Sequence, residues 1–202
     1  MATMTRNQSK PSFLGTLNAI SLAESGAGVY LEAWANATTD EDLACCLRFV
    51  AARETSHGDL FCRRIGELGF ELMQKPDPGA AERIAKYANP KISDLEKIGP
   101  EREEGADPFM DIERQLEDGI YDPLTAKLMT WYIAEERDSG AMLREAYAAA
   151  RAKARGHSMN GNGASAASSN GHSADAQALM ECMTAGFGRL EKALEKMAKA
   201  GK

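Results

Sequence analysis

Apolar residues recur along several stretches of the chain at alternating steps of three and four, the spacing that keeps side chains on one face of a helix. Two such stretches predict long helices, one from about Ser12 to Ala37 and one over residues 43–68. Ionisable side chains interrupt both stripes and are therefore expected to face the core. The inward positions are Leu17, Ile20, Glu24, Ala27, Leu31 and Trp34 in the first helix, and Leu43, Leu47, Val50, Glu54, His57 and Phe61 in the second.

These two helices are expected to form a tight antiparallel hairpin. The sequence Thr-Thr-Asp-Glu between them is a turn, in which Thr39 or Asp40 caps the second helix. Glu24 and Glu54 each lie about 15 residues from the turn, so they stand at about the same height. Because a buried, unpaired carboxylate is costly, a metal ion is a natural partner for Glu54 and His57. The alternative is a core histidine hydrogen-bonded to its neighbouring glutamate.

The second half of the chain repeats this organisation. A charged crossover over about residues 75–105 leads to a third helix, expected over about 107–118, and a fourth, expected over about 122–154. Both begin with an Asp-Pro pair, a helix-start signal. In the fourth helix, Glu135 and Asp138 occupy the places that the Glu-x-x-His pair has in the second. The stripe, with identical steps, consists of Leu124, Leu128, Trp131, Glu135, Asp138 and Met142.

With these residues the chain resembles the ferritin-like superfamily, in particular the rubrerythrin-type di-iron carboxylate proteins, over about residues 12–150. The resemblance implies an all-α fold, an antiparallel four-helix bundle made of two helix hairpins. It also implies two metal ions, iron or manganese, held between the helices where they bind peroxide or dioxygen. By this resemblance the ligands would be Glu24, Glu54, His57 and Glu135, with Glu54 or Glu135 bridging the ions.

The sequence departs from the family pattern at two places. Asp138 stands where the second Glu-x-x-His motif has its histidine, although aspartate is still a hard oxygen ligand for iron or manganese. The glutamate expected from the third helix is either Glu104 or Glu113. Counting back from Glu135 leads to Glu104, whereas Glu113 shares a stripe with apolar residues but lies close to the turn. An incomplete site would bind one ion, two ions weakly, or none.

The segments outside the bundle differ in composition from it. Residues 1–11 are expected to be disordered, and residues 12–155 form the bundle. Residues 156–174 are rich in Gly, Ser, Asn and Ala and predict a flexible linker. Residues 175–202 predict a C-terminal amphipathic, coiled-coil-like helix that docks on a sister tail, on its own bundle, or on a partner. Its stripe consists of Met180, Met183, Phe187, Leu190, Leu194 and Met197.

The composition of the chain indicates which partners and which cellular compartment to expect. The net charge of −6 and the pI of about 5.2 argue against nucleic acid or an anionic membrane as a partner. The N-terminal segment lacks the apolar stretch of a secretory signal, and no uncharged run near it is long enough to span a bilayer. None of the four cysteines forms a C-x-x-C pair, which excludes a rubredoxin-type iron site and is typical of a cytoplasmic protein.

Two functions are compatible with these features. The first is an oxidoreductase in which iron or manganese acts on peroxide or dioxygen, and which needs a separate electron donor because the chain has no rubredoxin-like cysteines. The second is a non-catalytic scaffold whose buried carboxylates form a degenerate site. Trp131 and Tyr132 are expected close to Glu135, where packing in the bundle is the simpler role for both.

Overall fold

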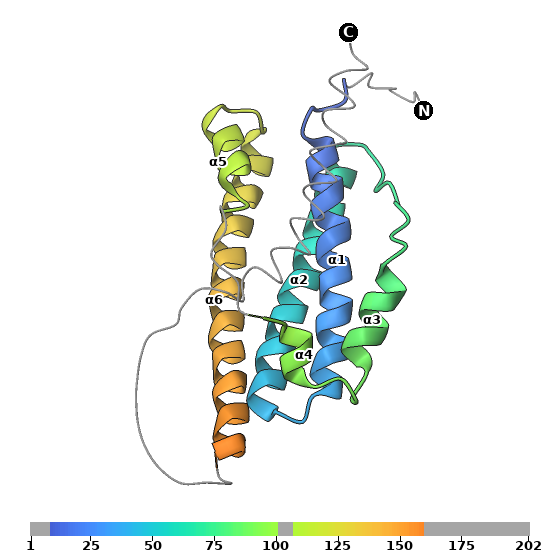
Figure 1. Ribbon diagram of the computed structural model, residues 1–202. Coiled ribbons are helices and arrows are strands. Elements are labelled where there is room, and N and C mark those ends of the chain that lie inside the picture. The colour runs from blue at the N-terminus through green and yellow to red at the C-terminus, as the bar shows by residue number, and fades with distance from the viewer. Residues whose placement is uncertain (1–8, 101–106, 160–202) are drawn as a thin grey trace.

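The computed structural model describes residues 9–100 and 107–159, and side chains up to residue 156. Every regular element in these ranges is a helix, which confirms the all-α class. Three helices are long and three are short (Figure 1). In chain order they are α1 (Leu14–Ala37), α2 (Glu41–Glu67), α3 (Ala80–Ala88), α4 (Asp94–Ile98), α5 (Met110–Glu117) and α6 (Pro123–Met159).

Helices α1 and α2 form the expected hairpin. Asp40 caps α2, and its carboxylate accepts hydrogen bonds from the backbone N–H groups of Asp42 and Leu43. Two glycines let the helices approach closely at mid-length. A Cβ atom at Gly58 would lie 2.3 Å from the Ser25 Oγ, and one at Gly28 would lie 2.3 Å from the Thr55 Oγ1. The hairpin is therefore tightest beside the residues that interrupt its two stripes.

Helix α6 packs against α2 and runs antiparallel to it (Figure 1). Asp122 caps α6, as the Asp-Pro signal indicates, by accepting from the N–H groups of Leu124 and Thr125. The Arg64 guanidinium ties the end of α2 to this cap through hydrogen bonds to Asp122 and Thr125. The ends of the two helices are thus fixed to each other by charge-assisted hydrogen bonds.

The inward stripe of α6 was predicted wrongly by one residue. Leu124 and Trp131, which were expected to face the core, are 62% and 40% exposed. The reason is that α6 carries two adjacent apolar stripes, and the hairpin buries the second of them. The buried positions are Thr125, Met129, Tyr132, Glu136, Ser139 and Leu143.

The short helices lie against different parts of the long ones: α3 packs on α1, and α4 and α5 pack on α6 (Figure 1). Phe109 and Ile112 of the α5 region and Ile98 of α4 enter the core, and α4 is anchored to α1 because Asp94 accepts from the Trp34 Nε1 at 2.7 Å. In Figure 1, α5 lies near the start of α6 and α4 lies farther along it. The expected third helix over about 107–118 corresponds to α5, while α3 and α4 fall within the predicted crossover, and a regular four-helix bundle is not established.

Several expectations fall on residues outside the described ranges. These are the N-terminal residues 1–8, the segment 101–106 with Glu104, and residues 160–202, which include most of the predicted linker and the C-terminal helix. Helix α6 itself continues to Met159, past the predicted start of the linker. Among the described helices, none is both long and apolar enough to cross a membrane.

Candidate metal centre

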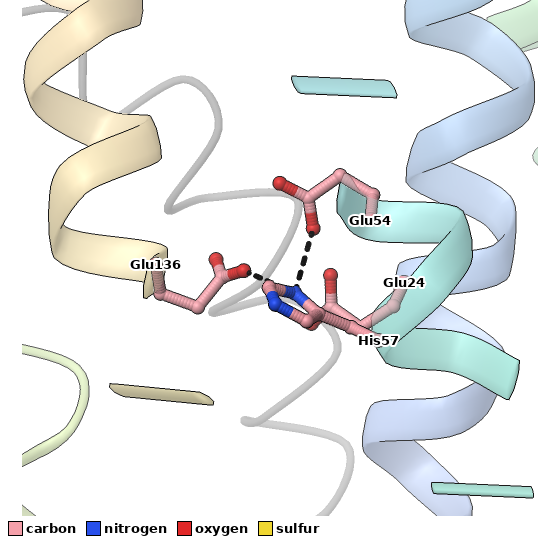
Figure 2. A group of neighbouring side chains, drawn as sticks. All are labelled: Glu24, Glu54, His57 and Glu136. Atoms are coloured by element: carbon pink, nitrogen blue, oxygen red, sulfur yellow. Dashed lines mark ion pairs between the residues drawn. The ribbon is translucent and has the colours of Figure 1, made fainter. Parts of the chain in front are cut away.

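Four ionisable side chains from three helices meet in the middle of the molecule (Figure 2). They are Glu24 from α1, Glu54 and His57 from α2, and Glu136 from α6; we call them the Glu3His cluster. Each offers one ligand atom, and these atoms all lie within 4.8 Å of one another. All four residues are buried, and none is more than 4% exposed.

The α1–α2 hairpin places three members of the cluster as the sequence predicts. Glu24 and Glu54 lie at equal heights on either side of the turn, and the absent side chain of Gly58 lets α1 come close beside His57. The Ser21 hydroxyl donates a hydrogen bond to the Gly58 carbonyl at 2.8 Å, which ties the helices together one turn from Glu24. The prediction that these residues meet in the core is confirmed.

Most of the polar atoms of the cluster have no hydrogen-bond partner. Among the described residues, seven buried side-chain nitrogen and oxygen atoms are unpartnered, and six belong to these four residues. The seventh is the Lys97 ammonium in α4. Leaving one buried polar group unsatisfied costs about 1–3 kcal/mol, and more if it is charged. Two of the six, His57 Nδ1 and Glu136 Oε1, lie 2.9 Å apart as an ion pair without hydrogen-bond geometry, and the six atoms together converge on one point as the ligands of a cation would.

His57 is held between carboxylates on both edges of its ring. Its Nδ1 lies 2.9 Å from Glu136 Oε1 and 3.9 Å from Glu54 Oε2, inside the cluster. Its Nε2 lies 2.9 Å from Glu135 Oε2, and a carboxylate accepts a hydrogen bond from a ring N–H. Nδ1 faces the interior of the cluster and is the atom that would bind a metal, while Glu135 orients the ring from outside, an arrangement common around metal-bound histidines.

The surroundings of His57 favour its protonated form when no metal is bound. Burial by itself lowers the pKa of His57, but the carboxylates of Glu136, Glu54 and Glu135 outweigh this effect and raise the pKa to about 10. A metal ion must therefore displace a proton from Nδ1 in order to bind.

Two carboxylates of the cluster, Glu24 and Glu136, hold protons more tightly than usual. Burial, followed by the proximity of Glu54, raises the pKa of Glu24 well above its ordinary range. Burial and the Glu24 charge raise the pKa of Glu136 to about 7, against the opposing influence of His57. Without a cation, several buried carboxylates cannot all be ionised together.

Two aromatic residues of α6 line the cluster. The Tyr132 hydroxyl is fully buried and donates to Glu24 Oε1 at 2.6 Å. The rings of Tyr132 and Trp131 both meet the His57 ring edge-on, at centroid distances of 5.2 and 5.1 Å. Both residues therefore lie beside the cluster, and Tyr132 adds a proton donor to it.

Three other residues predicted as ligands lie outside the cluster. Glu135 faces the outer nitrogen of His57 and is 29% exposed. Asp138 is 60% exposed and pairs with Arg53 at 2.8 Å. Glu113 of α5 pairs at the surface with Arg137, and the structure does not bring it to the cluster. Glu104, the alternative to Glu113, belongs to the undescribed segment 101–106.

Glu136 was not among the predicted ligands, because the stripe predicted to face inward on α6 is the wrong one of two. The stripe through Met129, Tyr132 and Leu143 has the same 4-3-4-3-4 steps as the one that was chosen. A signal in its favour was present, since it carries only one charged residue whereas the other carries Glu135 and Asp138 together. Burying one carboxylate costs less than burying two.

The donor set determines which ions fit. Three carboxylates and one imidazole are hard to borderline ligands, which suit iron, manganese or zinc better than copper(I). The described part of the site has no cysteine, so thiolate-based centres are not formed by these residues. The geometry therefore fits a divalent metal ion, although it does not by itself choose among them.

Comparison with known proteins finds no match among protein-family models, curated proteins or solved structures. The resemblance to ferritin-like proteins therefore rests on the residues described above.

Proposed function

We propose that this protein binds iron or manganese at the Glu3His cluster and acts as an oxidoreductase on peroxide or dioxygen. The observation that carries the proposal is the convergence of six unpartnered buried atoms from four ionisable side chains. A core that needed only packing would place apolar side chains at these positions, since buried ions are costly without a partner. The resemblance to rubrerythrin-type proteins supports iron or manganese over zinc.

The bound ion would supply one-electron redox chemistry and an open position for a small oxygen ligand. The chain's own residues would prepare the site for it. Glu135 orients the His57 ring through its contact with Nε2 at 2.9 Å, and Nδ1 faces the cluster. The Tyr132 hydroxyl donates to Glu24 Oε1 at 2.6 Å and would be a proton donor beside the cluster for a reduced oxygen species.

Electrons for this chemistry would come from a separate donor protein. The chain has no C-x-x-C pair that would form a rubredoxin-type iron site. The family resemblance implies a pair of iron ions at such a site.

Anaerobic titration with ferrous iron tests the binding step. The wild-type chain should bind iron stoichiometrically, and E54Q/H57Q should lose at least 100-fold in affinity, because two of four ligands are gone. E113Q is the matched control, because it removes a carboxylate that pairs with Arg137 at the surface. Equal, negligible binding by wild type and E54Q/H57Q would end the proposal and leave the scaffold function.

A second measurement separates chemistry from binding. Iron-loaded wild type should consume hydrogen peroxide with oxidation of its iron, seen as a new absorption in the near ultraviolet, while E54Q/H57Q should not. Tight binding without any reaction with peroxide or dioxygen would show a metal-stabilised scaffold instead.

A further inference from the structure

The buried stripes of α2 and α6 align position by position. Both follow steps of 4-3-4-3-4, from Leu43 to Phe61 in α2 and from Thr125 to Leu143 in α6. In this alignment Glu54 corresponds to Glu136, and both are in the cluster. His57 corresponds to Ser139, which is also fully buried. The second motif of the pair is therefore Glu-x-x-Ser, and its last residue has no imidazole to offer.

A fixed positive charge occupies the neighbourhood of Ser139. The Arg53 Nη1 donates to the Ser139 Oγ at 3.0 Å, to Asp138 Oδ2 at 2.8 Å and to the Glu135 carbonyl at 3.2 Å. Its side chain is only 15% exposed. A guanidinium cannot lose its proton in a protein, so this charge is permanent and repels a divalent cation placed next to it.

The nearby acidic groups are already engaged. Glu135 faces the His57 Nε2, and Asp138 is paired with Arg53. The four ligand atoms of the cluster lie within 4.8 Å of one another, so small side-chain movements would bring them around one ion, whose ligands lie at most about 4.2 Å apart when each bond is about 2.1 Å long. Two ions sharing the site would need further ligands on the Ser139 side, which the described residues do not supply.

We propose that the Glu3His cluster takes one divalent ion per chain, and that the Arg53–Ser139 pair stands in place of the second ion of a di-metal carboxylate site. This inference rests on the metal binding proposed above. The Arg53 guanidinium is paired with Asp138 at 2.8 Å and lies 3.0 Å from the Ser139 Oγ, so it holds a positive charge on the side of the cluster where a second ion would need ligands. One divalent ion reduces the formal charge of three carboxylates and a neutral imidazole from −3 to −1, and a second ion on the Ser139 side would meet the guanidinium.

The ratio of metal to protein tests the proposal on the full chain. Equilibrium dialysis against Mn²⁺, followed by elemental analysis, should give one ion per wild-type chain. The electron paramagnetic resonance spectrum should be the six-line pattern of isolated Mn²⁺. Two ions per chain, or the multiline spectrum of a coupled pair, would overturn it. No bound ion would instead contradict the metal binding on which the inference rests.

A designed variant tests the role of Arg53 and Ser139. R53Q/S139H removes the guanidinium charge and restores the second histidine, and it should raise the ratio from one towards two. S56H is the matched control, because it adds a histidine at an exposed position of α2 and should leave the ratio at one. A folded R53Q/S139H protein that still binds one ion would overturn the role given to the pair, while the wild-type ratio tests the single-ion claim even if this variant fails to fold.

Discussion

At the scale of single residues, His57 connects the interior of the cluster with its outer edge. One ring nitrogen faces the cluster and the other meets Glu135, which the sequence indicated as a ligand and which the structure places behind the histidine. The difference matters chemically, because an outer carboxylate tunes a ligand without contacting the ion. Replacing Glu135 should therefore weaken binding without abolishing it.

The variant E135Q makes this distinction measurable. Glutamine keeps the size of the side chain but lacks the charge that raises the basicity of His57, so we expect the metal affinity to fall about 10- to 100-fold. E145Q, an exposed carboxylate on the same helix, is the control and should not change the affinity. A complete loss of binding in E135Q would show that Glu135 is a ligand itself.

The pH dependence of stability of the metal-free protein follows from the same residue. The pKa of His57 is raised to about 10 in the folded state, above the ordinary value of 6.5, because Glu136 and Glu135 on α6 and Glu54 on its own helix outweigh the opposing effect of burial. The stabilisation is therefore fully present below about pH 6.5 and is lost as the pH rises towards 10. Glu136, whose pKa is raised to about 7, acts in the same direction at lower pH.

Metal-free wild type should consequently become less stable between pH 7 and pH 9, by at most about 1.4 kcal/mol per pH unit for one proton. Urea unfolding at several pH values measures this slope. The variant H57Q should flatten it. A wild-type stability that rises with pH over this range would show that His57 is neutral in the folded, metal-free protein.

At the scale of elements, the sequence predicted the α1–α2 hairpin. It predicted the rest of the site only in part. Glu24, Glu54 and His57 were identified because each helix of the hairpin has one apolar stripe and a clear turn between them. Helix α6 has two adjacent stripes of equal periodicity, and only packing against α2 decides between them, so Glu136 was missed. The docking of α4 on α1 depends on a tertiary contact, the hydrogen bond from Trp34 to Asp94, which no local sequence pattern encodes.

The close packing of α1 on α2 makes one glycine critical. An alanine Cβ at Gly58 would lie 2.3 Å from the Ser25 Oγ and 3.0 Å from the Ser25 backbone nitrogen, so the helices must separate beside the cluster. We expect G58A to destabilise the protein by about 1–3 kcal/mol, as overpacking does, and to weaken metal binding.

The control for this prediction is G26A. A Cβ at Gly26 meets no atom within 4 Å, so alanine should stabilise α1 by up to about 1 kcal/mol. Thermal or urea unfolding of the two variants measures both changes: the free energy of unfolding should fall in G58A and rise in G26A. Equal stability of G58A and wild type would show that the hairpin is looser at the cluster than the structure indicates.

At the scale of the whole molecule, the buried apolar core lies within residues 13–150. The predicted linker and C-terminal helix follow this core, and their role in self-association or partner docking stays a prediction. Truncation after Met159 should leave the melting temperature and metal content unchanged, because no described core residue is removed. A drop in oligomeric mass by light scattering would support docking through the tail, and unfolding of the truncated chain would show that the tail is part of the core.

The most direct test of the central claim is a crystal structure of the full chain grown with excess Mn²⁺, with anomalous diffraction data. The account predicts one anomalous peak per chain, about 2.1 Å from His57 Nδ1 and from carboxylate oxygens of Glu24, Glu54 and Glu136. A cluster without a peak, or a peak located instead between Glu135 and Asp138, would contradict it.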